Sequence, residues 1–173
     1  LRDLSYDVHP YKHTTMGFFK DIEDMPNQLA YSRTFFERWY RPEYASVIVV
    51  GDIEIESALD NIEKHWGGWK PGNFTSEIPQ EPARNGMRYE HVQWAAPTLP
   101  WMLHGFRAPA FSTDATDAAA LALAAELYFG PSTPLYQKLV IQDRMVETLY
   151  VGPARNRDPS LFTIAVQLSK PEH

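Results

Sequence analysis

Proline is distributed unevenly along this chain, and its positions limit where regular structure can form. Six of the 14 prolines lie between residues 71 and 109: Pro71, Pro79, Pro82, Pro97, Pro100 and Pro109. Each proline fixes φ and lacks the N–H that a helix interior or a central strand needs. The polar part of this stretch, residues 71–85, is typical of a connector. The chain is therefore expected to form one unit before the connector and one after it.

The residues before the connector predict a helix, a strand and a second helix. Asp24 can cap the first helix, which continues until Arg41-Pro42 stops it. The β-branched run 46–51 predicts a strand that is buried on both faces. A second helix follows Gly51-Asp52 and ends at Gly67-Gly68. The apolar stripes that support these helices are Leu29, Phe35, Phe36 and Trp39 in the first, and Ala58, Leu59, Ile62 and Trp66 in the second.

The residues after the connector predict strands and helices in an α+β order. The strands are expected at residues 87–95 and 101–108, between the last helix and residue 160, and at 161–168; the helices are expected at 112–129 and 134–145. Gly130 ends the first helix, and Pro134 suits the first turn of the second. We therefore expect an α+β fold with a mixed, mainly antiparallel sheet and helices packed on one face, and we expect this fold to be incomplete at both ends of the chain.

Composition excludes several classes of protein. With 44% hydrophobic residues the chain can bury a core, so it is not a disordered tail. It has 16 basic and 22 acidic residues, a net charge of -6 and no basic cluster, which argues against nucleic-acid binding. Cysteine is absent, which excludes disulfides, Cys-liganded zinc and thiol nucleophiles. The longest apolar run, residues 118–125, is too short to cross a bilayer.

The histidines do not show the spacing that zinc hydrolases use, because neither H-E-x-x-H nor H-x-x-E-H occurs. His9 and His13 are four residues apart, but a proline lies between them, so a solvated or loop-anchoring role is favoured over a metal site. His65 is expected at the C-terminal end of a helix, where it interacts with the helix dipole. His91 and His104 are expected in two strand segments that could approach each other, but without a fixed carboxylate partner they are weak evidence for catalysis.

Other short motifs do not predict an active site either. Gly51-Asp52 follows a predicted strand but lacks the G-x-G-x-x-G series of dinucleotide-binding turns. Residues 130–134 lack the Lys-Ser/Thr of a phosphate-binding loop, and Asp21, Glu23 and Asp24 are typical of a solvated face. No nucleophile is paired with an oriented base. Residue chemistry alone therefore predicts no catalytic, cofactor-binding or metal-binding residue.

Short motifs nevertheless follow one another in a recognisable order along nearly the whole chain. They are His9-Pro10-Tyr11, Gly17, Asp21-Ile22-Glu23-Asp24-Met25, Phe35-Phe36-x-x-Trp39-Tyr40-x-Pro42, Val47-Ile48-Val49-Val50-Gly51-Asp52, Ile62-Glu63-Lys64-His65-Trp66-Gly67 and Gly130-Pro-Ser-Thr-Pro-Leu135-Tyr136-Gln-Lys-Leu139. This order resembles the pitrilysin/insulinase metallopeptidases, the family that includes the mitochondrial processing peptidase.

The resemblance implies a place for this chain within a longer peptidase. In the family each half holds two similar α+β domains, and the zinc ligands, H-x-x-E-H and a later Glu, lie upstream of the His-Pro-Tyr region. Residues 1–75 would then be the C-terminal part of the zinc-type domain, 76–86 a connector, and 87–173 the N-terminal part of the noncatalytic domain. Zinc would belong to the parent protein, where it acidifies a water and the Glu of the motif acts as base, and this segment alone would be inactive.

One further family feature concerns an Arg and a Tyr seven residues apart that the noncatalytic half supplies to hold substrate. The corresponding positions here are Val140 and Glu147, and neither matches. Arg144 and Tyr150 are nearby but six residues apart and shifted, so the role is not transferred to them. This departure is consistent with the rear of a zinc-bearing half and also with a wholly inactive half.

The resemblance leads to one main hypothesis of function and leaves others open. The segment is expected to form chamber wall and domain interface for peptide hydrolysis by its parent, with a peptide or unfolded polypeptide and the other half of the peptidase as partners. A catalytically dead scaffold subunit of the same fold, or an unrelated acidic binding module, are the alternatives. A homodimer could form through an unpaired sheet edge. The expected compartment is the bacterial periplasm or cytoplasm.

Overall fold

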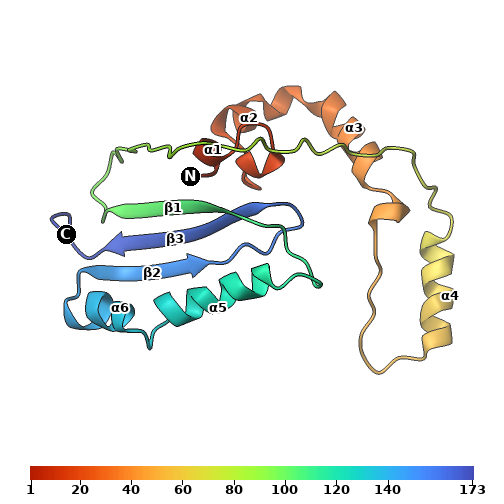
Figure 1. Ribbon diagram of the computed structural model, residues 1–173. Coiled ribbons are helices and arrows are strands. Elements are labelled where there is room, and N and C mark those ends of the chain that lie inside the picture. The colour runs from red at the N-terminus through yellow and green to blue at the C-terminus, as the bar shows by residue number, and fades with distance from the viewer. The chain divides into compact units, whose positions relative to one another are not determined.

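The computed structural model describes residues 1–173 and contains two compact units (Figure 1). Unit 1 consists of Leu1–His13 together with Gln80–His173, and unit 2 consists of Thr14–Pro79. The chain therefore begins in unit 1, leaves it for unit 2, and returns. None of the helices combines the length and the apolar character that a bilayer span requires.

Unit 1 contains a three-stranded antiparallel sheet with β3 in its centre. The strands are β1 (Trp101–Ala108), β2 (Val146–Gly152) and β3 (Ser160–Leu168), in the order β1-β3-β2. Trp101 pairs with Gln167 at one end of β1 and Ala108 with Ser160 at the other. The strands predicted at 101–108 and 161–168 are confirmed, and so is the α+β class. The sheet is antiparallel throughout.

The helices of unit 1 lie beside β2 (Figure 1). Helix α5 (Asp117–Phe129) ends at Gly130, as the sequence predicts. Helix α6 (Pro134–Tyr136) begins where the Thr133 hydroxyl accepts the Tyr136 N–H at 3.2 Å. It continues as the π-helix η4 (Gln137–Gln142), closed by a 2.8 Å bond from the Asp143 N–H to the Lys138 carbonyl. The helix predicted at 134–145 is therefore only partly α-helical and ends earlier.

The first residues of the chain cover one face of this sheet. They form α1 (Arg2–Ser5) and the 3₁₀ turn η1 (Pro10–Lys12). A Cβ on Gly105 would lie 3.3 Å from the Leu1 Cδ1 atom, so the absence of a side chain at Gly105 lets Leu1 approach the sheet. On the same face, the Arg107 guanidinium lies 4.6 Å above the ring of Tyr6, which is 2% exposed. Segment 1–13 is thus part of the core of unit 1.

Unit 2 is built mainly from helices. They are α2 (Phe19–Asp24), the 3₁₀ turns η2 (Met25–Asn27) and η3 (Pro42–Tyr44), α3 (Leu29–Trp39) and α4 (Ile55–Trp66). The helices predicted on either side of residues 46–51 are therefore present as α3 and α4, although α3 begins later than Asp24. Phe74 returns to α3, where its ring meets Trp39 edge-on at 5.3 Å and its carbonyl accepts the Tyr44 O–H at 2.6 Å.

Two predicted strands, 46–51 and 87–95, are wrong for this chain. Both segments lack regular structure, and no backbone hydrogen bond pairs residues 46–51 with another segment. Instead of being buried on both faces, Ile48 is 82% and Val50 90% exposed. The physical reason is that a strand exists only with a neighbour to satisfy its N–H and C=O groups, and residues 1–173 place no neighbour beside these segments.

The burial of Tyr6 predicts a large difference between two tyrosine substitutions. Replacing Tyr6 with Ala removes the most buried large side chain and should lower the free energy of unfolding of unit 1 by about 3 kcal/mol. Tyr89, which is 79% exposed, is the matched control, and Tyr89→Ala should have little effect. Urea unfolding of both variants checks this. Equal losses would show that segment 1–13 is not part of the core.

Candidate functional site

A buried carboxylate lies where the connector enters unit 1. The side chain of Glu81 is only 5% exposed. Its oxygens accept three successive backbone N–H groups, from Asp7 at 2.7 Å, Val8 at 3.0 Å and His9 at 2.9 Å. Three backbone N–H groups that converge in this way form an anion-binding site, and the anion bound in it is the Glu81 carboxylate.

Three arginines complete what we call the Glu81 cluster, which consists of Asp7, Glu81, Arg84, Arg88 and Arg107. The Arg107 Nη2 atom, projecting from β1, lies 3.1 Å from Glu81 Oε1. Arg84 and Arg88 hold the Asp7 carboxylate at 2.9 and 2.8 Å. Both also donate to the Leu4 carbonyl at the end of α1, and Arg107 donates to the Ser5 carbonyl. Segment 1–13 is thereby tied both to the connector and to the sheet.

Both carboxylates of the cluster are held in the ionised form. Burial opposes ionisation of Glu81, but the N–H donors of Asp7, His9 and Val8, together with Arg107, outweigh it and lower the pKa of Glu81 to about 2. Hydrogen bonds from Arg88 and Arg84 lower the pKa of Asp7 to about 2. A carboxylate with so low a pKa is a poor general base near neutral pH, so the geometry favours a structural role.

The His9-Pro10-Tyr11 motif anchors the same segment. The His9 Nδ1 atom accepts the Tyr11 N–H at 3.0 Å and so caps η1, while Nε2 lies 3.7 Å from an Asp158 carboxylate oxygen. The Tyr11 hydroxyl accepts the Asp158 N–H at 3.3 Å, and the His9 and Tyr11 rings contact each other in a tilted arrangement, with 4.2 Å between their centroids. His9 is buried, so the loop-anchoring role applies to it. The motif ties segment 1–13 to the connection between β2 and β3.

The remaining histidines do not gather into a metal site. His65 lies in the last turn of α4, where an imidazole interacts favourably with the helix dipole. His104 lies on β1 opposite Ile164, whereas His91 lies on the irregular segment 87–95. Across residues 1–173, no three His, Asp or Glu side chains are placed so that they could hold a metal ion.

The positions compared with the family's Arg-Tyr pair lie on two different elements. Val140 lies on η4, and Glu147 lies on β2 at an irregularity in the pairing with β3. Arg144 has a φ of +51° and Tyr150 pairs with Ala165 in the sheet. No contact joins Arg144 to Tyr150, so the structure gives no reason to assign them a shared role.

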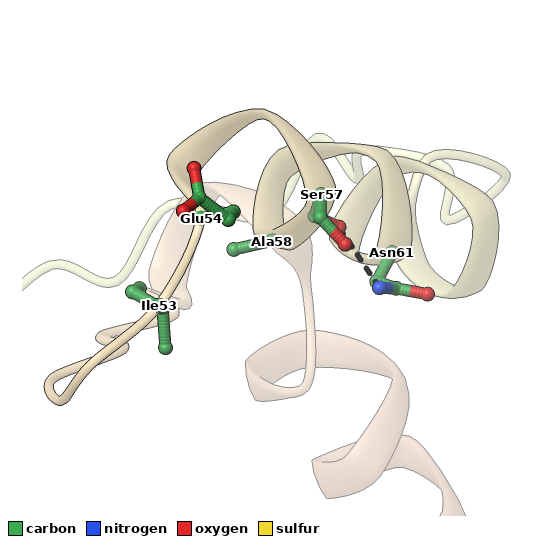
Figure 2. Close-up of a pocket in the computed structure, with 5 residues that line it drawn as sticks. All are labelled: Ile53, Glu54, Ser57, Ala58 and Asn61. Carbon is green, nitrogen blue, oxygen red and sulfur yellow. Dashed lines mark hydrogen bonds between the residues drawn. The ribbon is translucent and has the colours of Figure 1, made fainter.

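Unit 2 contains two shallow depressions without catalytic groups. Figure 2 shows one of about 360 Å³, lined by Ile53 and Glu54 and by Ser57, Ala58 and Asn61 on α4. The Asn61 amide in it donates to the Ser57 carbonyl at 2.8 Å. The other, of about 230 Å³, is lined only by aliphatic side chains: Val47, Val49, Ile53, Ile55, Ala58, Leu59 and Ile62. Neither pairs a nucleophile with a base, so we assign no reaction to them.

The sequence did not predict the Glu81 cluster. Glu81 lies 72 and 74 residues along the chain from His9 and Asp7, whose N–H groups it binds, and local periodicity carries no information at that separation. The available signals were Glu81 and Arg84 within a segment interpreted as a connector, Arg88 in the predicted strand 87–95, and the position of the His-Pro-Tyr motif.

Comparison with known proteins gives consistent matches. The family model described as "Peptidase M16 inactive domain" matches residues 29–173. The zinc protease PqqE of Helicobacter pylori is 31% identical over 166 residues, which cover 92% of this chain and 36% of that protein. The crystal structure of a protease from Helicobacter pylori matches with a TM-score of 0.84 and 27% identity, over 98% of this chain and 41% of the other. The chain thus spans less than half the length of these relatives.

The low pKa of Glu81 predicts a specific loss of stability in acid. Because the folded pKa lies near 2, below the ordinary 4.5, the stabilisation is complete above about pH 4.5 and is lost as the pH falls toward 2. The urea midpoint of unit 1 should therefore fall over that range. Glu81→Gln should lower the midpoint at neutral pH and weaken its acid dependence. An unchanged acid profile in the variant would contradict the assignment.

Proposed function

This chain belongs to the M16 peptidase family, and from that premise we propose that it is the noncatalytic segment of a zinc metalloendopeptidase of the pitrilysin/insulinase type. The observation that carries the proposal is the match of the inactive-domain family model along residues 29–173. The likeness to a protein named as a zinc protease, and to a protease structure over almost the whole chain, supports it.

The residues of this chain do not fit a zinc site, so zinc is proposed for the parent protein and not for this segment. Zinc in proteins is held by at least three His, Cys or carboxylate ligands. Here one nitrogen of His9 is occupied by the Tyr11 N–H, and no group of three ligands exists among residues 1–173. Cleavage therefore depends on other parts of the parent, and no catalytic step is assigned to this segment.

The proposed domain boundaries are residues 1–75 for the end of the zinc-type domain, 76–86 for the connector and 87–173 for the noncatalytic domain. These boundaries differ from those of the two compact units, because segment 1–13 packs with the residues after the connector. On these boundaries, segment 1–13 is a piece of the zinc-type domain that contacts the noncatalytic domain. The Glu81 cluster then supports a role of this chain at an interface between domains.

Exposed aliphatic side chains on unit 2 support a second interface. Ile48 and Val50 on segment 46–51 and Ile55 and Leu59 on α4 are all more than half exposed. Large apolar side chains that are exposed to this degree are typical of a surface that another element covers. In the proposed parent, another part of the protein covers segment 46–51.

The sheet edges of unit 1 support the proposed polypeptide partners. Strands β1 and β2 each pair with β3 on one side only, so each keeps one free row of backbone N–H and C=O groups. An extended peptide substrate, a strand of the other half of the peptidase, or a second copy of this chain can pair with such an edge. A chamber wall built in this way would present backbone hydrogen bonds to an unfolded polypeptide.

The proposed function predicts the behaviour of the full-length parent. The parent should contain zinc and cleave unstructured peptides, and a chelator should abolish the cleavage. The 173-residue chain alone should neither bind stoichiometric zinc nor hydrolyse peptides. Metal analysis and a peptide-cleavage assay check both proteins. A parent without zinc and without chelator-sensitive cleavage would favour the scaffold alternative.

The proposed interface on unit 2 predicts that Ile48 matters only in the parent. Because Ile48 is 82% exposed here, Ile48→Asp should leave the urea midpoint of the 173-residue chain nearly unchanged. In the parent the same change would bury a charge and lower the unfolding temperature markedly. Ile48→Val, which keeps an apolar side chain, is the control. An unaffected parent would show that nothing covers this surface.

A further inference from the structure

The Glu81 cluster lies where the chain passes between its two units. Unit 2 occupies residues 14–79, so the chain leaves unit 1 after His13 and returns at Gln80. Glu81 is the second residue of the returning segment, and its three N–H donors are residues 7–9, just before the departure. The hydrogen bonds therefore join the two segments that connect unit 1 to unit 2.

We infer that Glu81 is a positioning residue that holds the departing and returning segments side by side within unit 1. We call this pairing of residues 7–9 with residues 80–81 the root. Besides stabilising the fold, Glu81 then controls the spacing between the segment that leaves unit 1 and the segment that returns to it. With the hydrogen bonds of Glu81 broken, residues 79–81 would no longer be held against residues 7–9, although the contact of Tyr11 with Asp158 would still hold the departing segment.

Contacts on both sides of Glu81 also hold the two segments of the root in place. Arg107 anchors the Glu81 carboxylate to β1, which belongs to the sheet. The Asp7 carboxylate is held by Arg84 and Arg88, further along the returning segment. Beyond residue 9, the Tyr11 hydroxyl is bound by the Asp158 N–H. The departing segment is thus fixed from residue 7 to residue 11.

Glu81 is the central group because it alone satisfies three consecutive backbone donors. A neutral amide in its place would have a single acceptor oxygen and would turn an N–H₂ group toward either an N–H or Arg107. At least one buried donor would then lose its partner, which costs more than the loss of an ordinary hydrogen bond. Loosening should therefore begin at residues 7–9 and not in the sheet.

The consequence for catalysis rests on the proposed function. If unit 2 belongs to the zinc-bearing domain of the parent, the root sets the spacing of its connections to the noncatalytic domain. Glu81→Gln in the parent should then raise KM for a long peptide several-fold while zinc content stays unchanged. A residue that merely stabilised the fold would instead lower the amount of active protein without altering KM.

Two measurements on the whole 173-residue chain test the root directly. Because the chain has no cysteine, spin labels can be placed at Lys12→Cys and Gln80→Cys, both in unit 1 and outside the Glu81 cluster. A narrow distance distribution is expected, and it should broaden in Glu81→Gln. Amide hydrogen exchange at residues 7–9 should accelerate about tenfold to a hundredfold, while the amides of β3 keep their protection. Glu77→Gln, at an exposed position of the connector, should change neither measurement.

Several results would overturn the inference. A narrow distribution in Glu81→Gln, or unchanged exchange at residues 7–9, would show that the segments stay together without the carboxylate. Equal acceleration in β3 would show that Glu81 only supports the overall fold. Should Glu81→Gln fail to fold, Asp7→Asn replaces it, since Asp7 is partly exposed, and it must broaden the distribution partially. A parent without zinc would refute the proposed function but leave these results standing.

Discussion

A buried carboxylate surrounded by backbone donors is the interaction on which much of unit 1 depends. Taking the Glu81 carboxylate out of water is unfavourable, and removing one partner from such a buried pair typically costs about 3–5 kcal/mol. Here three N–H groups and Arg107 compensate for the lost solvent. The compensation requires residues 7–9 to lie against the connector. The position of segment 1–13 is thereby coupled to the ionisation of one side chain.

The covered sheet face follows from that coupling. With residues 7–9 held by Glu81, Tyr6 lies beneath Arg107 and Leu1 reaches the gap left by Gly105. The core of unit 1 therefore contains residues that come before unit 2 in the sequence and residues that come after it. Unit 2 has no comparable buried core. No strand lies beside its aliphatic segment 46–51, and the side chains of that segment remain exposed. The two units thus differ in how much of their apolar surface and how many of their backbone hydrogen-bonding groups find partners within this chain.

The charged groups of unit 1 have structural roles, in agreement with the inactive-domain family model that the chain matches. In an inactive domain we expect charged groups to have structural roles. The groups brought together here hold backbone segments in place. The Glu81 and Asp7 carboxylates have pKa values near 2, and His9 uses one nitrogen to cap a turn. These groups therefore serve to hold the structure of unit 1.

The sequence by itself determined the local elements and the family. Apolar spacing located α3 and α4, Gly130 marked the end of α5, and alternation located β3, because these signals act within a few turns of one chain segment. The motif order from His9 to Leu139 was sufficient to indicate the pitrilysin/insulinase fold. Tertiary structure alone decided that segment 1–13 joins the sheet, that Glu81 meets residues 7–9, and that segments 46–51 and 87–95 stay unpaired. The contacts of Glu81 join residues that are more than 70 positions apart in the sequence, and the two unpaired segments have no neighbouring strand in this chain. No local sequence pattern encodes where such partners lie.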